Sequence, residues 1–147
     1  MDESGFGFRV AFDSAPAAQA VADHVKQQGG QADVEEEKGI LPLGILLVIF
    51  IPPGLALLAE VVNNVVHSWR DHGVVIDARG TGDPVIHEEK SLPFGTIVIL
   101  TRDGDTAKRT DLPEVDVGKY IAAALKAVGG GASASAAKTA ADTLLAA

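Results

Sequence analysis

The chain contains no cysteine, and aromatic residues make up only 5% of it. The lack of cysteine excludes disulfide bonds, thiolate zinc sites and cysteine nucleophiles. Basic residues are also few, because 12 Lys and Arg stand against 20 Asp and Glu and leave a net charge of −8. Such a charge repels phosphate backbones, so nucleic acid is not an expected partner.

The first residues, Met1 to Gly5, are acidic and polar and have no basic region followed by an apolar one. They therefore do not resemble a secretion signal, and a cytoplasmic location is expected. Apolar residues make up 47% of the 147 residues, enough for one domain with an aliphatic core. We expect this domain to cover residues 1–128. Residues 129–147 are rich in glycine and alanine and predict a flexible tail that could contain one weak helix.

Hydrophobic periodicity predicts strands and helices in alternation along the domain. The predicted order is strand, helix, strand, strand, helix, strand, at residues 6–12, 15–28, 31–38, 43–51, 55–70 and 74–78. This is the split βαβ order of ferredoxin-like folds. A hairpin around Asp103-Gly104 and a helix over 114–128 follow. We therefore expect an α+β fold, a ferredoxin-like βαββαβ core with an added C-terminal β-hairpin and helix. Residues 79–95 are expected to be a long loop with at most a short strand at 84–88.

The segment from Gly39 to Ala59 has no charged side chain. Its length meets the roughly 20 residues that a membrane-spanning helix needs, but Pro52-Pro53-Gly54 interrupts a continuous helix. A buried strand, a turn and the start of a helix are the simpler interpretation. Alternate positions of the strand form a candidate interface: Leu43, Ile45, Leu47, Ile49 and Ile51.

One face of the predicted helix at 55–70 is polar and continues to Asp71. Its candidate site residues are Glu60, Asn63, Asn64, His67 and Asp71. Spacings of three and four bring such side chains to one side of a helix, where carboxylates and an imidazole could bind a metal or move a proton. No HExxH motif is present, and a solvated helix face is the favoured interpretation.

The other short motifs do not indicate a binding site or a catalytic site. Asp103-Gly104-Asp105 lacks the further acidic ligands of a calcium loop and is better explained as a turn. The glycines of residues 79–83 could hold an anion, but neither a GxGxxG nor a GKS pattern occurs. No serine lies in a GxSxG motif. We predict no catalytic residue, no metal and no cofactor, and hence no enzyme.

Three stretches together resemble a known family. They are GILPLGILLVIFIPPGLALLAEVVNNVVHSW from Gly39, VVIDA from Val74, and TIVILTRDGDTAKRTD from Thr96. In their hydrophobic pattern they resemble the effector-associated constant component of bacterial conflict systems, a family of short adaptor domains. The resemblance covers roughly half the chain. It implies a non-catalytic adaptor and assigns no site residue.

The favoured hypothesis is a non-enzymatic interaction module that binds a protein partner or a second copy of itself through apolar surface around residues 39–69. Apolar surface beyond what a small domain needs often marks such an interface. The first alternative is a membrane-engaging protein that inserts residues 40–59. The second is a metal-binding or enzymatic domain that uses the polar face of the helix at 55–71.

Overall fold

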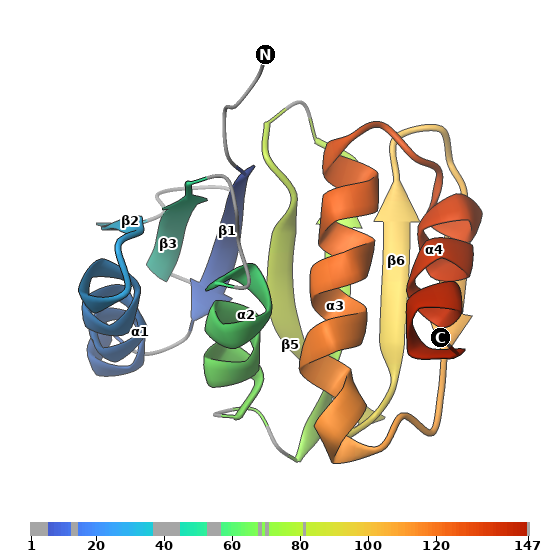
Figure 1. The fold of residues 1–147 in the computed structure, drawn as a ribbon, viewed down its shortest axis with the longest axis horizontal. Helices are drawn as coiled ribbons and strands as arrows, with labels where there is room; N and C mark the ends of the chain where they lie inside the picture. The colour runs from blue at the N-terminus through green and yellow to red at the C-terminus, as the bar shows by residue number, and fades with distance from the viewer. Residues whose placement is uncertain are drawn as a thin grey trace.

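The computed structural model describes residues 6–12, 15–36, 45–52, 57–67, 69, 71–80 and 82–146. They form a mixed α+β fold with one seven-stranded sheet (Figure 1). In chain order the elements are β1 (Phe6–Phe12), α1 (Ala15–Gln27), β2 (Gln31–Glu36), β3 (Ile45–Ile51), α2 (Leu57–His67), β4 (His72–Ala78), β5 (Val85–Pro93), β6 (Ile97–Thr101), β7 (Thr106–Arg109), α3 (Glu114–Gly129) and α4 (Ala134–Ala146).

The first half of the sheet follows the predicted split βαβ pattern. Strand β3 lies between β1 and β2 and is antiparallel to both. Helix α1 connects β1 to β2 and buries Ala18, Val21, Ala22 and Val25. These four residues are spaced three and four apart, so they lie on one helical face.

The second half departs from the ferredoxin-like prediction. The sheet order is β2-β3-β1-β5-β4-β6-β7, so β5, and not β4, is the neighbour of β1. Strand β5 runs back antiparallel along β4 and parallel to β1. The long loop predicted at residues 79–95, with a short strand at 84–88, instead contains the longer strand Val85–Pro93, which separates β4 from the position beside β1 that a ferredoxin-like order would give it. The predicted hairpin is confirmed, since β6 and β7 pair antiparallel.

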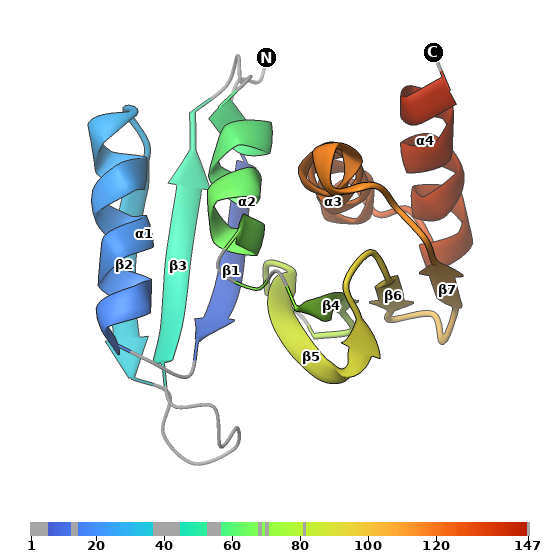
Figure 2. The same cartoon turned by 90° about the horizontal axis from the view of Figure 1, so that it is seen from below.

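The described helices all lie on one face of the sheet. In Figure 2 they stand in the order α1, α2, α3, α4 across that face. Side chains from alternate strand positions meet them to form the core, with Phe8, Leu47, Ile76, Ile86 and Ile99 among its largest members. The strands twist strongly from one end of the sheet to the other, as the two views show.

Residues 134–146, where a flexible tail with a possible weak helix was predicted, form helix α4. Three of its alanines, Ala134, Ala137 and Ala141, are completely buried. They are spaced three and four apart and pack against α3 and the β6–β7 hairpin. Each alanine buries little area, but its short side chain lets the two helices approach closely.

Among the described residues, no helix is both long enough and apolar enough to cross a bilayer. Residues 45–51 of the apolar segment form an interior strand whose two edges are paired with β1 and β2. Inserting them into a membrane would break both sets of hydrogen bonds.

Candidate functional site

The predicted polar face of α2 does not converge on one point. Glu60 Oε2 lies 4.0 Å from His24 Nε2 on α1. Asn63 lies on the other side, where it contacts Gly118 of α3 closely enough that an added Cβ would come 2.8 Å from its Oδ1. Asn64 is exposed. Glu60 thus faces α1, while Asn63 faces α3.

The remaining two candidates lie at the end of α2. His67 is exposed and lines a small hollow together with Asn63, Phe94 and Glu114, so the structure brings Asn63 and His67 to one hollow. Helix α2 ends at His67, four residues earlier than Asp71, so Asp71 is not on its face. Within the described part of the chain, no group of three or more His, Asp or Glu side chains is arranged to hold a metal ion.

The candidate interface residues on β3 belong to the core. Leu47, Ile49 and Ile51 are 0% exposed and contact the chain's own apolar side chains. Ile45 is partly buried against the same core, and Leu43 lies outside the described residues. These side chains are therefore covered by the chain itself and do not offer a surface to a partner.

The intervening residues of β3 point to the opposite face of the sheet, because side chains alternate along a strand. They are Leu46, Val48 and Phe50, and Phe50 is 38% exposed. The described helices leave this face uncovered (Figure 2). The positions predicted as an interface are therefore on the buried face of β3, and its more exposed side chains are at the intervening positions.

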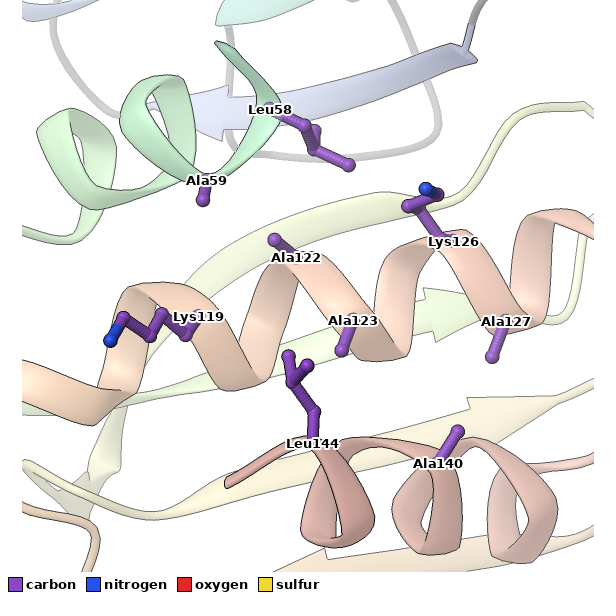
Figure 3. Close-up of a pocket in the computed structure, with 9 residues that line it drawn as sticks. All are labelled: Leu58, Ala59, Lys119, Ala122, Ala123, Lys126, Ala127, Ala140 and Leu144. Carbon is purple, nitrogen blue, oxygen red and sulfur yellow. The ribbon is translucent and has the colours of Figure 1, made fainter. Parts of the chain in front are cut away.

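A hollow lined by described residues lies on the outer surface of the helices, between α2, α3 and α4. It is an open groove of about 510 Å³. Its apolar lining consists of Leu58, Ala59, Ala122, Ala123, Ala127, Ala140 and Leu144 (Figure 3). The short alanine side chains leave the space between the helices unfilled, while Leu144, which is 52% exposed, reaches from α4 toward α3.

Two lysines, Lys119 and Lys126, complete the groove. They lie two turns apart on α3, about 10 Å along the axis, and both are exposed. Neither ammonium group forms an ion pair with a described residue.

A polar cluster holds α4 beside the groove. Asp142 on α4 accepts hydrogen bonds from Arg109 Nη1 at 2.7 Å and from Lys138 Nζ at 2.9 Å. Partial burial alone would raise the pKa of Asp142, but these two cations outweigh it and lower the pKa. The ring of Tyr120 lies under the Arg109 guanidinium, and burial raises the Tyr120 pKa to about 12. The phenol therefore stays neutral at physiological pH.

In the two loop motifs noted in the sequence, residues 79–83 and Asp103-Gly104-Asp105, the charged side chains form hydrogen bonds with nearby residues of the chain. Arg79 donates to both carboxylate oxygens of Asp77, which lowers the Asp77 pKa, so this arginine is committed to an ion pair within the chain. At the β6–β7 turn, Asp103 accepts from the Thr101 hydroxyl at 2.6 Å and from the backbone N–H of Asp105 at 3.1 Å. These contacts are those of a turn.

Searches of protein-family models, of curated proteins and of solved structures find no match to this chain. Function is therefore inferred from the geometry of the groove and of the sheet. Sequence reasoning missed the groove because its lining comes from helices that are far apart in the chain. Only the two lysines, seven residues apart on a predicted helix, could have indicated it.

Proposed function

We propose that the protein is a non-enzymatic interaction module that binds an apolar, acidic helix of a protein partner in the groove between α2, α3 and α4. The observation that carries the proposal is the apolar hollow with two unpaired lysines two turns apart. The scatter of the polar candidates on α2 supports a binding role over a catalytic one. The resemblance to an adaptor family implies a role of the same kind.

The shape of the groove favours a helix as its occupant. Its volume is within the range of binding pockets, and its lining follows α3 from Lys119 to Ala127, which suits an extended segment. Amphipathic helices bind such grooves through apolar residues spaced three, four and seven apart. Leucine-sized side chains of the partner would fill the hollow above Ala123 and Ala127.

The charges favour an acidic partner. Carboxylates seven residues apart on a helix have the same spacing as Lys119 and Lys126. Each exposed ion pair contributes only about 0.2–1 kcal/mol, so the lysines would select the partner while apolar contact supplies most of the affinity.

A synthetic peptide tests the proposal. The probe is a fluorescein-labelled amphipathic peptide that carries leucines on one helical face and two glutamates seven residues apart. The control peptide has the same sequence with lysines at those two positions. Fluorescence anisotropy measures the binding of each peptide. We expect the acidic peptide to bind and the basic peptide to bind at least tenfold more weakly. Equal binding of the two peptides would contradict the role of the lysines.

Protein variants complete the test. Reversing both charges with Lys119→Glu and Lys126→Glu is expected to weaken the binding of the acidic peptide about tenfold or more and to strengthen the binding of the basic peptide. Lys108→Glu, an equal reversal on the far side of the sheet, is the control and should change neither. Ala123→Leu fills the groove and should weaken the binding of both peptides. If the acidic peptide binds Ala123→Leu as it binds the unmodified protein, its site is not the groove.

A further inference from the structure

The face of the sheet opposite the helices, here called the open face, is apolar across five adjacent strands. Its apolar side chains are Leu46, Val48 and Phe50 on β3, Ala11 on β1, Val85 on β5, Val75 on β4, and Val98 and Leu100 on β6. Ala11, Leu46 and Val75 are only 6–8% exposed although they do not belong to the core under the helices, whereas Val48, Val85, Val98 and Leu100 are partly exposed and provide the accessible apolar surface of this face. The chain thus has an apolar layer on a face that no described helix covers.

Strand pairing aligns the open face in two rows that run across the sheet. The first row is, in sheet order, Leu46, Ala11, His87, Val75, Val98 and Lys108. The second row is Asp33, Val48, Arg9, Val85, Asp77, Leu100 and Thr106. Strand β5 is the middle strand of the seven, so His87 and Val85 stand at the centre of the two rows.

Each row is complementary to itself when it is reversed. A two-fold axis parallel to β5, between two facing copies, places β3 opposite β6 and β1 opposite β4. In the first row Leu46 then meets Val98. In the second row Val48 meets Leu100, and the cation Arg9 meets the anion Asp77.

The outer charges do not add to this match. The axis places edge strand β2 opposite edge strand β7, and in the second row the exposed Asp33 of β2 then meets Thr106, while the exposed Lys108 of β7 belongs to the first row. Arg9 already donates to the carbonyl of Asp83, and Asp77 accepts from Arg79. Both groups retain hydrogen-bonding capacity, since a guanidinium has five donors and a carboxylate about four acceptor sites.

We propose that the open face is the interface of a symmetric homodimer, with its two-fold axis along β5. Closed two-fold dimers use the same patch on both subunits, and the rows provide a patch that matches itself in both hydrophobicity and charge. Two sheets that pack face to face lie about 10 Å apart and cross at about −30°. Because the sheet twists, contact is tightest over β1, β5 and β4 and weaker at the edges.

This dimer is independent of the helix groove, which lies on the other side of the sheet. A dimer formed in this way leaves both grooves accessible and facing away from each other. One assembled molecule would then present two equivalent sites for acidic helices.

Site-directed cross-linking tests the axis directly. Because the chain has no cysteine, a Val85→Cys variant reacts only at the position that faces its own copy. A short bis-maleimide should join most Val85→Cys chains into covalent dimers at micromolar concentration. Val115→Cys is the control, since Val115 is 78% exposed on α3, away from the open face. Equal cross-linking of both variants, or none of either, would overturn the proposal.

A second measurement does not depend on the cysteine variants. Leu100→Lys places two charges against apolar partners in each dimer and should raise the dimer dissociation constant at least tenfold in sedimentation or light scattering. Val48→Lys should do the same from the other side of the contact, whereas Val115→Lys should have no effect. Circular dichroism and thermal unfolding check that each chain is folded. Folded Leu100→Lys and Val48→Lys proteins that associate as the unmodified protein does would refute this interface.

Discussion

Two adjacent residues of β3 provide the sharpest test of the fold on which both surfaces depend. Ile49 is 0% exposed and points into the core, while Val48 points to the open face and is only partly buried. Ile49→Ala removes three carbons from a closely packed site, and such truncations cost about 2–5 kcal/mol. Val48→Ala removes two carbons that are partly in contact with water, which at about 0.8 kcal/mol per buried methylene predicts a loss of about 1 kcal/mol or less.

Thermal unfolding at a low protein concentration, where association contributes little, measures the difference. For a chain of this size a loss of 1 kcal/mol lowers the melting temperature by about 2–4 °C. We therefore expect a fall of about 4–20 °C for Ile49→Ala and of at most about 4 °C for Val48→Ala. A strand shifted by one residue would exchange the two faces. A larger loss for Val48→Ala than for Ile49→Ala would therefore refute the assignment of both faces.

Two further predictions concern the helices. Gly118→Ala should destabilise the protein by about 1–3 kcal/mol despite alanine's higher helix propensity, because its Cβ would lie 2.8 Å from Asn63 Oδ1 and 3.2 Å from Asn63 Cα; a melting temperature that does not fall would contradict this close contact of α2 and α3. Asp105 accepts a hydrogen bond from the backbone N–H of Ser135 at 2.8 Å, which lowers the Asp105 pKa in the folded chain. Its contribution is therefore present above its unfolded pKa of about 4 and is lost as the pH falls through the lower folded pKa. Thermal unfolding from pH 7 to pH 3 should show a shallower acid loss for Asp105→Asn than for the unmodified protein, and identical acid profiles would count against this anchor.

Local pattern predicted most of the individual elements. Phe6–Phe12 is a strand with the predicted bounds, since aromatic and β-branched residues end there at Asp13. The break at Pro52-Pro53-Gly54 correctly separated a strand from a helix, which β3 and α2 confirm. The Asp103-Gly104 turn also fixed the final hairpin.

The sheet order could not be predicted in the same way. Strand β5 has the sequence VIHEEKSLP, whose charges resemble a loop, because only its first residues lie in the apolar middle of the sheet. Ile86 is its one completely buried side chain. No local signal states that this strand inserts between β1 and β4, because that choice depends on contacts between distant segments.

The candidate sites failed for a related reason. Periodicity groups Glu60, Asn63 and His67 on one side of α2, but it does not show that α1 and α3 lie on either side of that helix and divide the group. It also cannot show which face of β3 the helices cover. The groove and the open face both arise from the assembly of several elements, so each required the structure.

The central claim is that this chain forms a dimer through its open face. The mass of the unmodified protein in solution tests that claim most directly. Light scattering after size-exclusion chromatography should give twice the chain mass of 15.1 kDa at high micromolar concentration. On dilution the mass should fall toward that of a single chain. A protein that keeps the single-chain mass at every concentration up to the millimolar range would contradict the account of the open face.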